Sequence, residues 1–321
     1  MDMRSCFRDA VVLSFLLFTS SVKAEIETIR IASPNRGSWE GAIPEIGKQA
    51  GIFKKHGLNP EILYTSGGGE TLQVVISGAV DIGLSAGMAG VFSAFSKGAP
   101  IRVIGASSTG SKEVFYYVPA QSPLQSLKDL HGKTISYSTT GSSTHVGALK
   151  VIEEYALKGS RVVATGDAIS TTTQTLTGQV DVGWSNGPFN LDRLASGEIR
   201  MIGRLSDIAH MRGQTIRVQI GNAQAIAAKN DLFKRYLKAY QETLDWMYIS
   251  PEALKIYMGI VSFPEQSVKR TISEFITKDT LQISLVMGVP EAMADAIQFK
   301  FINSTLAENQ LAELIIINSL K

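Results

Sequence analysis

Four short segments rich in glycine and hydroxyl side chains are the parts of this sequence best suited to chemistry. Each follows a run typical of a strand or begins a helical pattern, and they are PNRGSW (34–39), SGGGET (66–71), SAG (85–87) and TTGSSTH (139–145). The first turn of a helix leaves backbone N–H groups unpaired, and the helix dipole favours a negative ligand there. Glycine lets a ligand approach the backbone, and Ser and Thr add donors. The segments therefore predict a binding edge.

The candidate ligand-binding residues come from these segments and from one later turn. They are Arg36, Ser38, Trp39, Gly67, Gly68, Gly69, Ser85, Ala86, Gly87, Thr139, Gly141, Ser142, Ser143, Thr144 and Asn186. Any single Gly-Ser turn is more often a plain helix cap. Arg36 could pair with an anion bidentately, and a solvated surface arginine is the equal alternative. Trp39 could wall a cleft or simply pack, and His145 is a further candidate for the lining.

One motif occurs twice, one hundred residues apart, first beginning at Gly78 and then at Gly178. GAVDIGLSAG returns as GQVDVGWSNG, with the shared frame G-x-V-D-x-G-x-S-x-G. The first glycine ends a helix, and the aspartate beside it can hydrogen-bond local backbone. We interpret Asp81 and Asp181 as equivalent structural residues in two similar lobes, not as a catalytic pair. The serine end of each copy should reach the cleft.

No residue pattern in the sequence predicts catalysis, a metal centre or a cofactor. GGGETL lacks the Lys-Ser/Thr ending of a phosphate-binding loop, and no G-x-S-x-G or H-E-x-x-H motif occurs. The four histidines have no metal-ligand spacing, and the single cysteine, Cys6, lies in a segment that we expect to be removed. Donors without an evident base or nucleophile indicate a protein that holds a solute and is not an enzyme.

The elements that must position these segments alternate between strands and helices. Strand patterns cover 28–33, 61–65, 79–85 and 101–107, and the same style restarts after residue 115. Helical patterns occur between these strands, including 39–50 and 88–97, and a later helix has one apolar face between residues 233 and 247. Such alternation predicts βαβ units and mostly parallel sheets, an α/β fold. We expect lobe 1 at 25–115, lobe 2 at 116–215, and a return to lobe 1 with C-terminal helices at 216–321. Strands at 114–119 and 215–228 should cross between the lobes.

Composition and the N-terminus restrict the compartment and the partners. The chain has 321 residues, of which 44% are hydrophobic and 19% charged, and its formal net charge is +2. No basic run predicts a nucleic acid or a membrane surface as partner. Arg4 and Arg8, an apolar run at 10–18 and the small Ala24 are typical of a secretory signal cleaved near residue 24. Because Cys6 precedes the apolar run, we predict a periplasmic protein without a lipid anchor.

Two longer stretches resemble a known family. Residues 32–85, which include AGIFKKHGL and GAVDIGLS, and residues 126–145 (SLKDLHGKTISYSTTGSSTH) are similar to the nitrate/sulfonate/taurine group of ABC-importer solute-binding proteins. The likeness covers most of residues 26–245 as an ordered set of motifs. It implies a type II periplasmic-binding-protein fold, with a cleft between two lobes that close by hinge motion on the solute.

The resemblance also implies a role, partners and site residues. The expected role is capture of a small anionic solute, such as a sulfonate, nitrate or taurine, by a monomer that delivers it to an inner-membrane permease. Gly141, Ser142 and Ser143 would hold the anion, faced by Ser85 and Gly87. The alternatives are a binder of a thiamine pyrimidine precursor or another heteroaromatic solute, and a secreted enzyme on the same fold. Related enzymes use a His/Cys-rich site, which the mature chain would lack.

Overall fold

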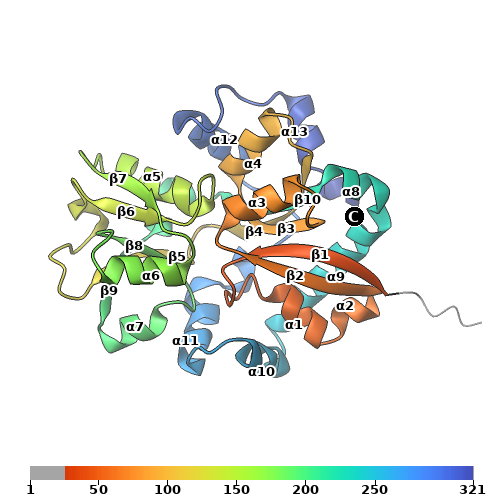
Figure 1. Cartoon of the computed structure of the whole chain (residues 1–321), viewed down its shortest axis with the longest axis horizontal. Helices are drawn as coiled ribbons and strands as arrows, with labels where there is room; N and C mark the ends of the chain where they lie inside the picture. The colour runs from red at the N-terminus through yellow and green to blue at the C-terminus, as the bar shows by residue number, and fades with distance from the viewer. Residues whose placement is uncertain (1–25, 321) are drawn as a thin grey trace, which may run out of the picture.

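The computed structural model describes residues 26–320 and has an α/β fold of two lobes with a helical C-terminal part (Figure 1). The predicted secretory signal and Cys6 lie outside the described residues. Lobe 1 is built on one five-stranded sheet, in the spatial order β2 (Leu58–Thr65), β1 (Glu27–Pro34), β3 (Ile82–Gly87), β10 (Thr215–Asn222) and β4 (Ile101–Thr109). The first three strands are parallel, and β10 is antiparallel to both of its neighbours.

The helices of lobe 1 follow the strands as predicted, with one boundary shifted. They are α1 (Ile43–Gln49), α2 (Ile52–Lys55), α3 (Gly68–Ile76) and α4 (Met88–Ser96). The predicted helix at 39–50 begins only at residue 43. The preceding residues 36–42 form turns, and Ser38 among them has no regular structure. Gly51 then ends the segment with a φ of 76°, a left-handed conformation that favours glycine.

Lobe 2 repeats the strand order of lobe 1 with a more divided sheet. β5 (Val114–Pro119) lies between β8 (Gly183–Asn186) and β9 (Ile199–Arg204), and β6 (Thr134–Tyr137) pairs with β7 (Arg161–Ala164) in parallel. A single parallel bridge between Ile135 and Val182 joins the two parts. The resulting order, β7-β6-β8-β5-β9, matches β2-β1-β3-β10-β4. The helices are α5 (Ser143–Glu154), α6 (Ala168–Leu176) and α7 (Leu191–Ser196).

The chain crosses between the lobes just before the predicted strands, not within them. β5 lies wholly in the lobe 2 sheet, and β10 lies wholly in the lobe 1 sheet. The connections are therefore residues 110–113 and 205–214, the second containing the short 3-10 turns Leu205–Asp207 and Ala209–Met211. The two lobes are therefore joined by two crossing segments, the kind of connection about which two-domain proteins close on a ligand.

The C-terminal helices cover lobe 1 and reach lobe 2. They are α8 (Ala223–Ala228), α9 (Asn230–Met247), α10 (Pro251–Ile260), α11 (Glu265–Arg270), α12 (Val289–Gln298) and α13 (Glu308–Leu314). The apolar face predicted for α9 is buried, with Phe233 and Tyr236 fully enclosed beside α1. α12 packs on α4 and contacts lobe 2 through a Lys150–Asp295 ion pair of 3.0 Å.

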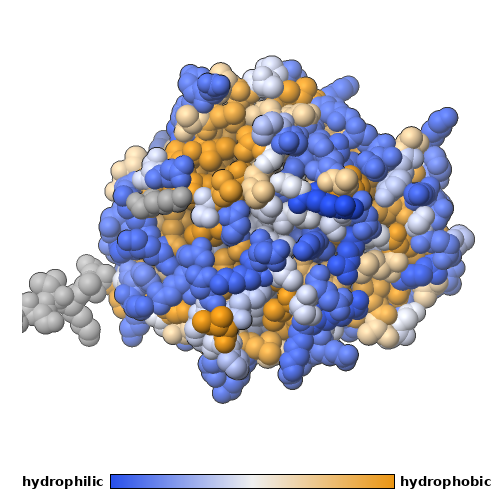
Figure 2. Space-filling model, turned by 180° about the vertical axis from the view of Figure 1, so that it is seen from behind, coloured by the Kyte–Doolittle hydropathy of each residue, from blue (hydrophilic) through white to orange (hydrophobic). Residues whose placement is uncertain are grey.

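Seen from behind, the surface of the molecule has hydrophobic patches among hydrophilic residues (Figure 2).

Within residues 26–320, none of the helices combines the length and the hydrophobicity that crossing a bilayer requires.

Candidate functional site

A small polar cavity lies between the two lobes, where the carboxyl ends of the parallel strands meet. Its free volume of about 20 Å³ is little more than one water molecule needs, so the lobes are closed on each other. The ends of parallel strands are where α/β proteins bind ligands. Lobe 1 contributes Pro34, Asn35, Ser38, Glu40, Gly68, Ser85 and Arg217, and lobe 2 contributes Ser138, Ser142, Ser143, Thr144, Trp184 and Asn186.

The wall from lobe 2 is a cluster of hydroxyls at the N-terminus of α5. Ser142 caps this helix, because its Oγ accepts a hydrogen bond from the backbone N–H of His145 at 3.2 Å. Ser138 Oγ donates to Ser142 Oγ at 3.0 Å, and Thr144 Oγ1 accepts from the Ser138 backbone N–H at 2.9 Å. These buried contacts hold the hydroxyls in place at the positive end of the helix dipole. The arrangement suits an acidic group.

His145 supports this turn and does not line the cavity. Its ring stacks on Tyr137 with 4.0 Å between the ring centroids, and its Nδ1 accepts a hydrogen bond from the Gly141 backbone N–H at 3.2 Å. Burial lowers the pKa of His145 to about 4, so the imidazole is neutral near pH 7. It therefore brings no positive charge to the α5 terminus.

Several glycines that we predicted to touch the solute instead let the lobes meet. A Cβ atom on Gly87 would lie 2.5 Å from the Gly141 carbonyl oxygen, and one on Gly69 would lie 2.3 Å from the Thr140 carbonyl oxygen. Across the same contact, the Gly69 backbone N–H donates to Thr139 Oγ1 at 2.9 Å. A side chain at either glycine would hold the lobes apart, so these residues determine how far the cleft closes.

The wall from lobe 1 contains a buried cluster of three charged side chains. Because β10 runs antiparallel to β3, Arg217 lies opposite Gly87, at the cleft end of the sheet. Its Nη2 contacts Glu40 Oε2 at 2.8 Å and also contacts Glu113 Oε1. Ser85 Oγ donates to Glu40 Oε1 at 2.6 Å, and Ser108 Oγ donates to Glu113 Oε1 at 2.7 Å. All of these side chains are buried.

The guanidinium of this cluster stays charged. Burial alone would lower the pKa of Arg217, but the negative charges and hydrogen bonds of Glu40 and Glu113 raise it above the ordinary value. One positive and two negative side chains therefore meet at the edge of the cavity.

Polar atoms without partners are concentrated around the cavity. Within residues 26–320, nine buried side-chain nitrogen or oxygen atoms have no hydrogen-bond partner, and four of them belong to residues that line this space. They are the donors Trp184 Nε1 and Arg217 Nε and the acceptors Asn35 Oδ1 and Asn186 Oδ1. A buried polar atom without a partner costs about 1–3 kcal/mol. A cluster of them in one cavity points to a ligand that would satisfy them.

The structure gathers about half of the predicted ligand-binding residues around the cavity. Ser38, Gly68, Ser85, Ser142, Ser143, Thr144 and Asn186 line it. Gly67, Gly69, Gly87, Thr139 and Gly141 lie at or beside the contact between the lobes.

Three predicted residues lie elsewhere, each for a physical reason. Arg36 is exposed, and its guanidinium lies over the ring of Tyr64 at 5.3 Å. Trp39 is fully buried, and its Nε1 donates to Tyr248 Oη at 3.1 Å while Tyr257 packs edge-on against its ring. Ala86 is buried within β3. Trp39 is thus a packing residue and not a wall of the cleft, and Arg36 lies on the surface and not in the cavity.

Six cavity residues were not among the predicted ones. They are Pro34, Asn35, Glu40, Ser138, Trp184 and Arg217. Glu40 carried a signal, because it is a charged residue inside the apolar run SWEGAI. Trp184 lies in the second motif copy, and Ser138 directly precedes the TTGSST segment. Arg217 carried no local signal, because only the pairing of β10 with β3 brings it to the cleft.

The aspartates of the two motif copies lie at the opposite ends of the sheets. Asp81 accepts from the Arg30 backbone N–H at 2.9 Å, and Asp181 accepts from the Thr134 backbone N–H at 2.8 Å. Asp81 therefore fastens β1 to the start of β3, and Asp181 fastens the equivalent strand β6 to the start of β8. This geometry agrees with the structural interpretation.

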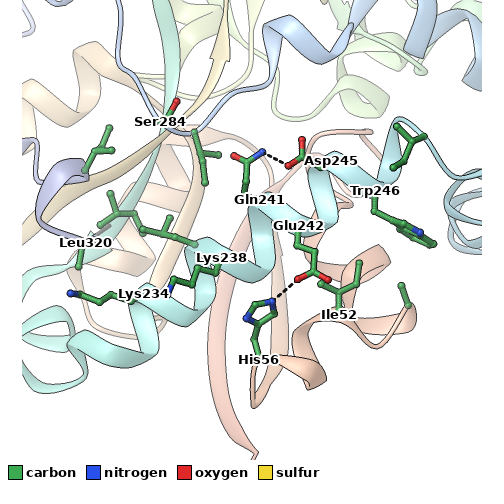
Figure 3. Close-up of a pocket in the computed structure, with 16 residues that line it drawn as sticks. Ile52, His56, Lys234, Lys238, Gln241, Glu242, Asp245, Trp246, Ser284 and Leu320 are labelled. Carbon is green, nitrogen blue, oxygen red and sulfur yellow. Dashed lines mark hydrogen bonds and ion pairs between the residues drawn. The ribbon is translucent and has the colours of Figure 1, made fainter.

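A second, larger hollow lies on the outer side of lobe 1 along α9. It encloses about 980 Å³ and is lined mostly by apolar side chains, including Ile52, Leu237 and Trp246. Figure 3 shows Glu242 pointing to His56, with 2.8 Å between Oε2 and Nε2. None of the predicted site residues lines this hollow. Four of its polar side chains already bind in pairs, His56 with Glu242 and Gln241 with Asp245. The small cavity between the lobes is therefore the candidate functional site.

Comparison with known proteins agrees with this two-lobed architecture. The chain matches the family described as NMT1/THI5 like over residues 45–254. No curated protein matches the chain. Because the match covers more than half of its length, the chain belongs to the NMT1/THI5-like family.

Solved structures show that the chain has the periplasmic-binding-protein fold of type II. One is the alkanesulfonate-binding protein SsuA from Xanthomonas axonopodis pv. citri bound to MOPS, with 18% identity, a TM-score of 0.75, and 91% of this chain and 99% of that chain covered. The aliphatic sulphonate binding protein SsuA from Escherichia coli has 16% identity, a TM-score of 0.68 and coverage of 88% and 91%. The nitrate-binding protein NrtA from Synechocystis has 11% identity, a TM-score of 0.69 and coverage of 92% and 87%.

Proposed function

We propose that this chain is the solute-binding component of an ABC importer. It would capture one small solute between its lobes and deliver it to a permease in the inner membrane. The observation that carries the proposal is the cavity between the lobes, where four buried polar atoms lack partners. The structural neighbours described as sulfonate- and nitrate-binding proteins support the same role. We place the protein in the periplasm as a monomer.

Capture depends on rotation of one lobe against the other. The connections at 110–113 and 205–214 are the hinge in this proposal, and the closed state is held by the contact of Gly69 with Thr139. A cavity of about 20 Å³ is too small for an organic solute to enter or leave. Opening is therefore part of each binding cycle.

The solute carries an acidic group in this proposal, as a sulfonate, nitrate or taurine does. The N-terminus of α5 offers Ser142 and Ser143, whose hydroxyls and backbone N–H groups are donors. Hydrogen bonds to a charged group contribute about 1.5–3 kcal/mol each. This end of the cavity is where the acidic group would bind.

Calorimetry on the mature chain, residues 25–321, tests this assignment. Sulfonates, nitrate, carboxylates and pyrimidines are titrated into the wild type and into the Ser142→Ala/Ser143→Ala double variant. We expect the double variant to lose roughly tenfold or more in affinity for the solute that binds, because two donors are removed. An unchanged affinity would reject the assignment of the acidic group to α5.

A matched control separates binding from helix stability. Ser142 is a helix cap, and loss of a cap costs about 0.5–2 kcal/mol of stability. Asp167 caps α6 by accepting from the Ser170 backbone N–H at 2.7 Å and does not line the cavity. Asp167→Ala should therefore lower the melting temperature but leave the affinity unchanged.

The same samples decide between binding and turnover. If the protein is a binding component, the bound solute is recovered unchanged and in a one-to-one ratio after long incubation. Accumulation of a product, detected by mass spectrometry, would show an enzyme on this fold instead.

A further inference from the structure

The two walls of the cavity between the lobes have opposite electrostatic character. On the lobe 2 side, the N-terminus of α5 presents hydroxyls and the positive end of a helix dipole. On the lobe 1 side, Glu40 lies at the cavity with Ser85 and Arg217. A solute that touches both walls meets donors at one end and a carboxylate at the other.

The charges buried at the cavity do not cancel. Arg217 supplies one positive charge, and its two partners, Glu40 and Glu113, supply two negative charges. Within residues 26–320, Glu40 and Arg217 are the only Asp, Glu, Lys or Arg residues that line this space, and Glu113 adds its charge from behind Arg217. An uncompensated charge in a dry interior is unfavourable, and a second negative charge beside it is more so. Closure on a simple anion would thus enclose two negative charges.

The unpaired atoms likewise require both kinds of hydrogen-bonding group. Trp184 Nε1 and Arg217 Nε are donors that need acceptors from the solute, such as acidic oxygens. Asn35 Oδ1 and Asn186 Oδ1 are acceptors without a donor, on residues that line the cavity. An anion such as nitrate has no N–H or O–H to give, so it would leave both acceptors unsatisfied.

Building on the proposed function, we propose that the solute is a small zwitterion whose ammonium group binds beside Glu40 and whose acidic group binds at the α5 terminus. Its positive charge offsets the excess negative charge of the cluster, and its N–H groups satisfy the acceptors of the cavity. Glu40 is then the residue that determines specificity, since it admits ammonium compounds and disfavours simple anions. Of the solutes that the sequence predicts, sulfonate, nitrate and taurine, this inference favours the taurine-like case and disfavours nitrate and amine-free sulfonates.

The experiment compares matched compounds that differ only in an amine. Calorimetry on the wild-type mature chain uses 3-aminopropane-1-sulfonate against propane-1-sulfonate, and β-alanine against propionate. We expect the ammonium member of at least one pair to bind at least about tenfold more tightly, the size of one charge-assisted contact. Equal or tighter binding of the amine-free members would overturn the inference while the proposed binding function stands.

Two glutamate variants test where the preference originates. Glu40→Gln should abolish the preference for the ammonium member, because the carboxylate facing the solute is removed. Glu113→Gln should reduce it less, since Glu113 contributes charge behind Arg217 but does not line the cavity. Glu252→Gln, on the exposed face of α10, is the control and should retain the full preference. A preference that survives in Glu40→Gln would contradict the assignment.

The outcomes separate the inference from the function on which it rests. The comparison in the wild type does not depend on the folding of any variant. If anions, zwitterions and pyrimidines all fail to bind at millimolar concentration, the proposed function fails as well. If only anions or neutral pyrimidines bind, the function stands and the zwitterion is rejected.

Discussion

The two lobes have the same scaffold but use it differently at the cleft. Their strand orders match, and equivalent residues one hundred positions apart make the same contacts. The hydroxyls of Thr65 and Thr71 lie 2.6 Å apart, and those of Thr165 and Thr171 also lie 2.6 Å apart. Similar contacts at this offset indicate that the repeated motif builds the strand–helix–strand unit itself.

The difference begins at the serine of each copy. Ser85 has a φ of 54°, and its hydroxyl turns toward the cavity and donates to Glu40. Ser185 instead donates to the Phe189 carbonyl oxygen at 3.1 Å and lies beside Asn190. In lobe 2 its neighbours Trp184 and Asn186 reach the cavity. The repeat thus preserves the backbone frame, whereas the side chains that line the cavity differ between the copies.

Among these predictions, the largest loss of stability should come from adding a methyl group at an equivalent, tightly packed glycine in each lobe. A Cβ on Gly183 would lie 2.3 Å from the ring of Tyr117, and one on Gly83 would lie 2.7 Å from the methyl of Val75. Gly183→Ala should lower the free energy of unfolding by about 3 kcal/mol, and Gly83→Ala should lower it by somewhat less, because an aliphatic side chain can move aside more easily than an aromatic ring. Urea unfolding measures both, and a milder effect at Gly183 would contradict the ordering.

The next largest loss of stability should come from replacing the aspartates of the two motif copies, Asp81 and Asp181, which connect neighbouring strands. The carboxylate of Asp81 is buried although its partner Arg30 is partly exposed, whereas the side chain of Asp181 is 34% exposed beside Lys133. Asp81→Asn should cost about 2 kcal/mol, because a buried charge-assisted contact is lost, and Asp181→Asn should cost less. Neither should change solute affinity, as calorimetry would check. A larger loss of affinity than of stability would make these aspartates ligand residues.

Acid should remove the contribution of Asp81. Burial alone would raise the pKa of Asp81, but its hydrogen bonds with Arg30 and the charge of Arg30 lower it below the ordinary value. A depressed folded-state pKa stabilises the protein above the unfolded pKa of about 4, and this contribution disappears as pH falls through the folded value. The difference in melting temperature between wild type and Asp81→Asn should shrink below about pH 4. A constant difference would argue against the ion pair.

The serines of the two copies should separate affinity from stability. Ser85→Ala removes a hydroxyl at the cavity and should weaken solute binding by about 1.5 kcal/mol. Ser185→Ala should lower the melting temperature and leave the affinity unchanged, because its contacts are internal to lobe 2. Equal losses of affinity in both variants would show that the copies are functionally equivalent.

The smallest loss of stability should come from removing one hydroxyl of each threonine pair. Thr71→Val leaves Thr65 with only a long contact to the Gly67 carbonyl oxygen at 3.5 Å, so a cost of about 1 kcal/mol is expected. Thr171→Val should cost less, because Thr165 still donates to the Tyr137 carbonyl oxygen at 3.1 Å. Thermal unfolding of the two variants compares them, and the reverse order would contradict this account.

Local patterns predicted most of the scaffold. The strand at 28–33, the helix at 88–97 and the apolar face of α9 follow from periodicity and turn residues, which act over a few positions. The start of α1 was wrong by four residues, since 36–42 form turns despite a helical spacing of apolar side chains. Trp39 shows the same limit, because its apolar position suited either a core or a cleft, and only packing against Tyr257 decides for the core.

The sequence by itself determined the α/β fold, the two equivalent units and the hydroxyl-rich helix start at Ser142, because these depend on interactions between near neighbours in the chain. The tertiary structure alone decided which side chains share the cavity. Arg217 and Glu113 are 104 positions apart. They meet because β10 pairs with β4, which places Arg217 opposite Ser108, the residue that also donates to Glu113. Charge balance at a buried site is a sum over distant residues, so it can be evaluated only after the chain has folded.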